Sequence, residues 1–162
     1  VMLVGGPSQP TGLVIKAARN QGYKGGFAMM DQAKYEQVET VASLADMEGT
    51  IGVIPFRDYN GPGIKPFIEA YNKKYGTSRL PNSEIALNYM TMHLFAEAIG
   101  KANSTDAAAV MAKIPDAVKS LPGKYQPSKI SSVSKSGHLI IEAIGAMVEK
   151  GKYVPVPIPF TE

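Results

Sequence analysis

The first third of the chain alternates short apolar runs with amphipathic stretches. Three runs have the length and the turn-like endings of buried strands, and they lie at residues 2–4, 27–30 and 50–54. Two stretches between them repeat apolar side chains at helical spacing. One starts near Pro10 or Thr11 and ends before Gly22, and the other covers residues 33–45. Strand, helix, strand, helix, strand with short turns predicts right-handed crossovers and a parallel sheet.

The pattern becomes helical after residue 55 and strand-like after residue 122. Residues 63–75 and 83–102 predict two helices, and the second is apolar nearly all round, so we expect it to lie between layers. Ser104 or Thr105 is expected to cap a third helix that includes Ile114. Candidate strands follow at residues 129–133, 139–148 and 153–158. The last alternates valine and isoleucine with proline, which has no N–H for a ladder, so it predicts an edge strand or an extended tail.

Composition narrows the classes of function. The 162 residues, 44% hydrophobic and 19% charged, suffice for one ordinary globular domain or for pieces of two small ones. The net charge is only +3 and no basic run interleaves with aromatic residues, so we expect no nucleic-acid partner. The absence of cysteine excludes disulfides, zinc–thiolate sites and cysteine nucleophiles. No apolar run approaches the length of a membrane span.

The sequence offers no pattern for catalysis, for a metal or for a cofactor. Gly5 and Gly6 lack the spacing of a dinucleotide fingerprint. His93 lies among apolar residues of a predicted helix and is expected to pack there, whereas His138 follows a Ser-Gly turn. Neither histidine has a serine or carboxylate placed as in a catalytic triad, and the two have no metal-ligand spacing. We therefore predict no catalytic residues, no metal site, no cofactor and no enzymatic activity.

A binding site is expected where the predicted parallel strands end, because open α/β sheets bind ligands outside the carboxyl ends of their strands. Gly6 and Ser8 precede or open a helix, where backbone amides suit an anion or a polar group. Asp31 could accept hydrogen bonds from a ligand ammonium, and Phe56 could form an aromatic wall. Each also has a structural interpretation: Asp31 as a helix cap, Ser8 as a turn residue and Phe56 as core. On the residues alone, capping is the preferred reading of Asp31.

Several segments, taken in order, resemble one known family. They are V-G-G-x-x-x-x-x-G-L-V-I-K-A-A-R-x-x-G-Y (Val4 to Tyr23), F-A-M-M-D, E-G-T-I-G-V-I-P-F, F-I-E-A-Y-N-K-K-Y-G, A-x-x-Y-x-x-x-x-L-F-A-E-A-I-x-K-A, S-G-H and the closing G-K-Y-V-P-V. Together they cover nearly the whole chain. They resemble the periplasmic solute-binding proteins of branched-chain amino-acid ABC transporters.

The resemblance implies a type I periplasmic binding fold with two lobes joined by three crossings. Residues 1–56 would form most of the second lobe, a three-layer lobe built on a parallel sheet. Residues 57–121 would supply helices that return to an incomplete first lobe, and residues 122–162 would hold strands that cross between lobes and a tail. The missing part, about as long as this chain, would carry the site for the ligand carboxylate. Hydrophobic helices such as residues 85–99 would then pair with another copy or another chain.

The resemblance also implies a function. It predicts an extracytoplasmic protein, with its signal peptide removed, that captures an amino acid or an organic or aromatic acid and presents it to a membrane permease. Asp31 falls at the position of the acid that holds the α-ammonium group in amino-acid-binding members. Pro7 and Ser8 stand where those members have an aromatic contact, which leaves the class of ligand open. A sensor or regulator with the same fold is the alternative.

Overall fold

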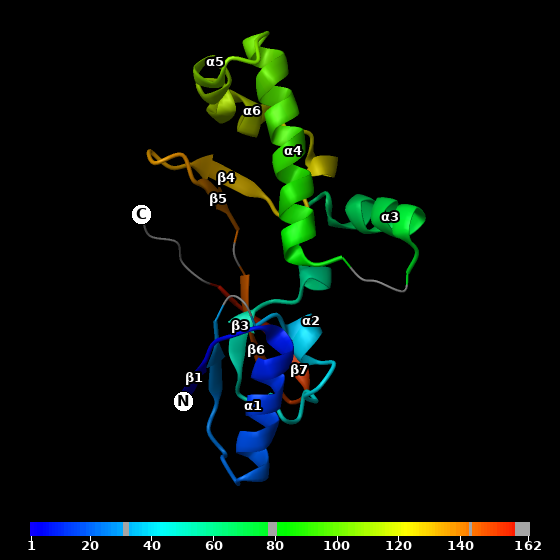
Figure 1. The fold of residues 1–162 in the computed structure, drawn as a ribbon, viewed down its shortest axis with the longest axis vertical. Helices are drawn as coiled ribbons and strands as arrows, with labels where there is room; N and C mark the ends of the chain where they lie inside the picture. Colours follow the sequence, from blue (N-terminus) through cyan, green and yellow to red (C-terminus); the bar gives the residue numbers. More distant parts are fainter. Residues whose placement is uncertain (31–32, 78–80, 143, 158–162) are drawn as a thin grey trace. The chain divides into compact units, whose positions relative to one another are not determined.

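The computed structural model describes residues 1–30, 33–77, 81–142 and 144–157, and it divides into two compact units (Figure 1). Unit 1 comprises residues 1–58 together with the segment that begins at residue 143, and unit 2 comprises residues 59–142. The chain thus passes from one unit to the other twice.

Unit 1 is built on a five-stranded mixed sheet in the order β1-β2-β3-β6-β7. Its elements are β1 (Met2–Val4), α1 (Ser8–Asn20), β2 (Phe27–Met29), α2 (Tyr35–Val38), β3 (Ile51–Val53), the 3-10 helix η1 (Phe56–Asp58), β6 (Ile144–Glu149) and β7 (Lys152–Pro157). The first three strands are parallel, as the sequence predicts, whereas β6 and β7 are antiparallel to their neighbours. The proline-containing β7 lies at the sheet edge, where its missing N–H groups cost no ladder bonds.

The two ends of α1 follow from local sequence. The helix begins at Ser8, earlier than expected, because Pro7 stands at the N-cap and Pro10 lies in the first turn, where its N–H is not needed. At the other end the Gly22 N–H donates to Arg19 O at 2.9 Å and the Tyr23 N–H to Ala18 O at 3.0 Å. Gly22 has a φ of 85°, which glycine adopts without the strain of a Cβ. This arrangement is a Schellman motif and confirms the predicted helix end.

The two faces of the unit 1 sheet differ. One face packs against α1 and α2 and includes Val4, Phe27 and Val148, all buried. The opposite face carries a row of apolar residues, one from each strand, that are paired in register: Leu3, Ala28, Ile51, Met147 and Val154. We call these residues the apolar row. Leu3 is 69% exposed, and Ile51 and Val154 are each 39% exposed.

Unit 2 is mainly helical. Its elements are α3 (Ile64–Tyr75), α4 (Ser83–Ala102), α5 (Ala107–Met111), α6 (Ile114–Ser120), the 3-10 helix η2 (Gly123–Tyr125), β4 (Ile130–Val133) and β5 (Leu139–Ile141). One face of α4 packs with α5, α6 and β4 into a core that contains Met90, Leu94, Val110 and Ile114. Asn82 caps α4, because its Oδ1 accepts the Ile85 N–H at 3.0 Å. No helix among the described residues is long and apolar enough to cross a membrane.

Three expected elements are corrected by the structure. The helix expected at residues 33–45 is reduced to α2 and followed by turns, one of which is held by hydrogen bonds from Ser43 to the Asp46 carboxylate. The expected third helix of unit 2 is two helices, and Asp106 caps the first of them in place of Ser104 or Thr105. Pro115 separates the two, because its ring cannot follow helical residues without striking the carbonyl four positions earlier. The strand expected at residues 139–148 is divided between β5 in unit 2 and β6 in unit 1.

Arg19 holds together the end of unit 1 that carries the turns before β2 and β3. Its guanidinium donates four hydrogen bonds of 2.7–2.8 Å to main-chain carbonyls, those of Tyr23, Gly25, Asp46 and Glu48. Its Cζ also lies 4.7 Å from the centroid of the Phe27 ring. One planar group therefore satisfies carbonyls from two separate turns.

We expect Arg19→Lys to lower the free energy of unfolding by about 2 kcal/mol, because an ammonium cannot reach four carbonyls in a planar array. Urea unfolding followed by circular dichroism measures the change. Lys16→Arg, on the exposed side of the same helix, is the matched control and should leave the midpoint unchanged. Equal midpoints for Arg19→Lys and the parent chain would show that water replaces these bonds.

Candidate functional site

The loops that follow β1, β2 and β3 open at the same edge of the unit 1 sheet, because the three strands are parallel neighbours. We call this edge the loop edge. Two of these loops are tied together. The Met30 N–H donates to Val4 O at 3.0 Å, and the Lys34 N–H donates to Ser8 Oγ at 2.9 Å. Ser8, only 3% exposed, therefore fixes the start of α1 to the segment after β2. These two hydrogen bonds hold the loops after β1 and β2 in a fixed arrangement at this edge.

The five predicted site residues have different environments. Gly6 and Pro7 line a groove of about 370 Å³ beside β1 and the first turns of α1. Gly6 has a φ of 145°, a conformation that side chains rarely adopt, so the loop depends on glycine here. Ser8 is buried and engaged with Lys34, and Phe56, in η1, is only 3% exposed. Asp31 lies outside the described residues.

The chemistry of the groove is that of a binding surface. The described residues that line it are apolar except for Thr11, whose Oγ1 donates to Gly6 O at 3.2 Å. Pro10 has no N–H, so the first turn of α1 offers fewer backbone donors than an ordinary helix. Within the part of the chain that the structure describes, no three histidine or carboxylate side chains gather as metal ligands. The groove therefore suits an apolar group, and a charged ligand would require further partners.

A cluster of side chains that no sequence pattern indicates fixes η1, the last element of unit 1 before residue 59. The Tyr153 hydroxyl donates to the Glu39 carboxylate, and Arg57 Nη2 donates to the same carboxylate at 2.8 Å. Burial, followed by the hydrogen bond to Glu39, raises the pKa of Tyr153 well above its usual range. The hydrogen bond to Glu39 also raises the pKa of Arg57. No local signal identifies the cluster, because its members are far apart in the sequence.

The two histidines belong to unit 2, whereas the loops after β1, β2 and β3 belong to unit 1. His93 stacks on Tyr125 with ring centroids 3.8 Å apart and contacts the edge of Tyr89 at 4.6 Å. Burial and the nearby Lys124 lower the pKa of His93. His138 lies in the turn between β4 and β5, where its Nδ1 is 3.2 Å from Ser136 Oγ. Both positions agree with the packing and turn roles that the sequence predicts.

Comparison with known proteins identifies relatives of the chain. A family model described as periplasmic binding protein matches residues 1–152. A Leu/Ile/Val-binding protein homolog 7 from Brucella abortus is 31% identical over 107 residues, which cover 60% of this chain and 26% of that protein. The chain thus spans about a quarter of the length of these curated relatives.

Solved structures share the fold. A leucine-binding protein LivK from Thermotoga maritima is 21% identical with a TM-score of 0.68, and the match covers 95% of this chain and 43% of that one. The branched-chain amino acid transporter substrate binding protein LivJ from Streptococcus pneumoniae, solved with isoleucine, is 19% identical with a TM-score of 0.69, covering 96% and 43%. These relatives are solute-binding proteins and not enzymes. The chain therefore belongs to the periplasmic binding protein family.

Proposed function

We propose that the chain is part of the solute-binding component of an ABC transporter and that it binds an amino acid or a related small carboxylate outside the cytoplasm. The observation that carries the proposal is the loop edge of unit 1, where loops joined by hydrogen bonds follow parallel strands. The family model, which matches residues 1–152, supports it. The names of the relatives support an amino acid as the ligand class. The membrane permease is the proposed partner.

Binding would work by closure of two lobes. In this proposal residues 1–56 form most of one lobe, residues 57–121 return to the other, and residues 122–162 cross between them. The two passages of the chain between units, after residue 58 and after residue 142, support two of the crossings. A ligand that contacts both lobes only in the closed form selects that form, and no bond is made or broken.

Asp31 is the proposed anchor for the ligand ammonium group. The Met30 N–H donates to Val4 O and the Lys34 N–H donates to Ser8 Oγ, so the described residues that flank Asp31 in the sequence belong to the loop edge. Gly6 and Pro7 would contact the body of the ligand from the groove. Ser8 would position the loop, and Phe56 would support it from the core side.

We expect Asp31→Asn to weaken the binding of an amino acid by about 10- to 100-fold, because a charged hydrogen-bond partner contributes about 1.5–3 kcal/mol. Titration calorimetry of the full-length protein with L-leucine, L-phenylalanine and 4-hydroxybenzoate measures the effect. Binding of 4-hydroxybenzoate, which has no ammonium, should not change. Asp116→Asn in unit 2 is the matched control. Unchanged binding of both amino acids to Asp31→Asn would limit Asp31 to a structural role.

The proposal as a whole is tested by the mass of the small molecule that co-purifies with the full-length protein. Native mass spectrometry should detect a small acid that dissociates unchanged. Chemical turnover of that molecule would contradict a transport function.

We also propose that the 162-residue chain self-associates with a second copy. The apolar row leaves one face of the mixed sheet partly exposed, although parallel strands such as β1, β2 and β3 are ordinarily covered on both faces. In unit 2 the face of α4 opposite the core exposes Met92 at 70%, Phe95 at 41% and Ile99 at 40%. Apolar faces of this kind mark contact surfaces.

A further inference from the structure

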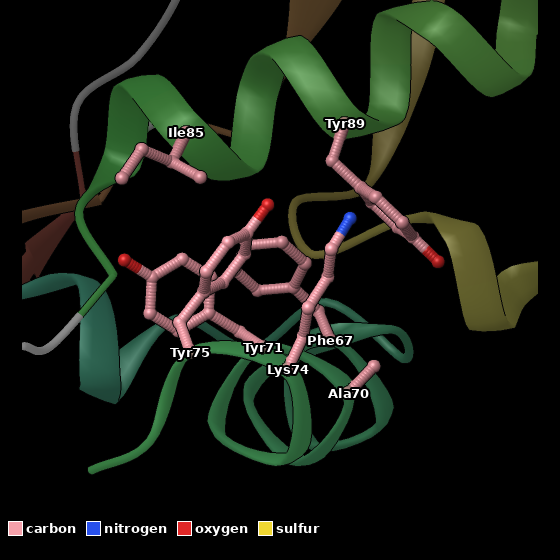
Figure 2. Close-up of a pocket in the computed structure, with 7 residues that line it drawn as sticks. All are labelled: Phe67, Ala70, Tyr71, Lys74, Tyr75, Ile85 and Tyr89. Carbon is pink, nitrogen blue, oxygen red and sulfur yellow. The ribbon is translucent and has the colours of Figure 1, made fainter.

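A second pocket opens within unit 2, between α3 and α4, and it has a chemistry of its own (Figure 2). Its volume is about 240 Å³. Its lining consists of four aromatic rings, one ammonium group and two aliphatic side chains: Phe67, Tyr71, Tyr75, Tyr89, Lys74, Ala70 and Ile85. The residues of α3 project towards α4, whose Ile85 and Tyr89 close the opposite side. None of these residues is part of the loop edge of unit 1.

The rings form a continuous series of contacts. The centroids of Tyr75 and Tyr71 are 4.9 Å apart, those of Tyr71 and Phe67 are 6.1 Å apart, and those of Phe67 and Tyr89 are 5.1 Å apart. Phe67 and Tyr71 are buried, so the floor of the pocket is fixed by packing, whereas Tyr75 is 58% exposed at its mouth. Tilted rings at these distances offer both faces and edges to a further ring.

Lys74 is the charged residue among the described lining residues. Its Nζ lies 5.2 Å from the centroid of the Tyr75 ring, and Figure 2 shows the ammonium group directed into the space between the two helices. The ion pairs found among the described residues do not include Lys74. A positive charge at the rim of an aromatic pocket favours an anion that is attached to an apolar body.

We propose that this pocket binds a single-ring aromatic carboxylate. The ring would stack among Phe67, Tyr71 and Tyr89, and the carboxylate would accept hydrogen bonds from Lys74. The volume is below the range typical of pockets for drug-sized ligands, which favours one ring over a larger molecule. An aliphatic acid would lose the ring contacts, and an uncharged aromatic would lose the contact with Lys74. The site does not depend on ligand binding at the loop edge.

The proposal is tested by titrating the ¹⁵N-labelled chain with benzoate and following its amide resonances. Residues of α3 and the first half of α4 should shift, and cyclohexanecarboxylate and benzyl alcohol should each bind at least tenfold more weakly. Lys74→Met should weaken benzoate binding at least tenfold. Lys73→Met, at the exposed neighbouring position outside the pocket, is the matched control and should bind as the parent chain does.

A second variant separates the ring contacts from the charge. Tyr75→Leu removes an exposed ring at the mouth while keeping an apolar side chain, and it should weaken benzoate binding several-fold with unchanged circular dichroism. Shifts confined to residues 5–8 and 30–34 would overturn the aromatic pocket while supporting the loop edge as the site. Equal affinities for Lys74→Met and Lys73→Met, or no shifts at millimolar benzoate, would also overturn it. Asp31→Asn should leave benzoate binding in unit 2 unchanged.

Discussion

Replacing Tyr35 with alanine is expected to lower the free energy of unfolding of unit 1 by about 3–5 kcal/mol, the range found when a buried aromatic side chain is removed. Tyr35 is 0% exposed, and its ring centroid lies 4.7 Å from that of Tyr153. Its hydroxyl donates to Thr50 O at 2.8 Å and to Ala146 O at 3.1 Å. One side chain thus joins the short α2 to the place where the parallel and antiparallel parts of the sheet meet. Urea unfolding followed by circular dichroism measures the loss.

Tyr35→Phe separates the hydroxyl from the ring. It should cost about 0.5–1.5 kcal/mol, because the hydrogen bond that the single hydroxyl proton shares between Thr50 O and Ala146 O is lost while the packing remains. Thr50 O keeps the Val148 N–H as a donor at 2.9 Å. A similar loss of unfolding free energy for the alanine and phenylalanine variants would show that the hydrogen bonds, and not the ring, hold α2 against β3 and β6. Equal stability of all three proteins would contradict the structural role of Tyr35.

The pH dependence of stability provides a further test of the same group. Burial raises the pKa of Tyr35 above its ordinary value of 10.0. Above about pH 10 the unfolded chain therefore releases this proton while the folded chain retains it, so the stability of the folded form falls as the pH rises. Below pH 10 the contribution is fully present. The parent chain should lose stability between pH 10 and 11 more steeply than Tyr35→Phe does.

The elements that the sequence predicts well are those fixed by nearby residues. The bounds of α4 agree with expectation because Asn82 caps it and its apolar pattern is uninterrupted. The parallel order of β1, β2 and β3 follows from apolar runs separated by helix-length segments and short turns. For the same reason the sequence predicts that the loops after these strands share one edge.

The elements that the sequence predicts poorly depend on distant partners. The segment after α2 has helical apolar spacing, but hydrogen bonds between Ser43 and Asp46 stabilise a turn there. The two strands β5 and β6 are continuous in pattern, yet they belong to different units. The cluster joins Glu39 to Arg57, 18 positions away, and to Tyr153, 114 positions away, so no local pattern identifies it.

The candidate site shows the same limit. Topology places Gly6 and Pro7 at the loop edge, but the burial of Ser8 and Phe56 depends on side-chain packing that spacing does not reveal. Ser8 is the first residue of α1 and not the turn residue that the sequence allowed, and its Oγ accepts a backbone N–H from the neighbouring loop. The role of Asp31 stays a prediction.

Placing a charge in the apolar row should convert the self-associated chain to a monomer. Ile51 pairs with Ala28 on one side and with Met147 on the other, so it lies at the centre of the row. In a symmetric dimer each copy would bury the exposed part of its own Ile51, and Ile51→Lys would instead place an unpaired ammonium group from each copy in the contact, which is strongly unfavourable. Ile51→Lys should therefore raise the dissociation constant of the dimer at least about 100-fold.

Sedimentation velocity over a range of concentrations measures this change. Asn20→Lys adds the same charge at the exposed end of α1 and should leave the association intact. Phe95→Lys separates the two surfaces: it should have little effect if the sheet face of unit 1 forms the contact, and it should abolish the dimer if α4 of unit 2 does. A parent chain that sediments as a monomer at all concentrations would contradict self-association.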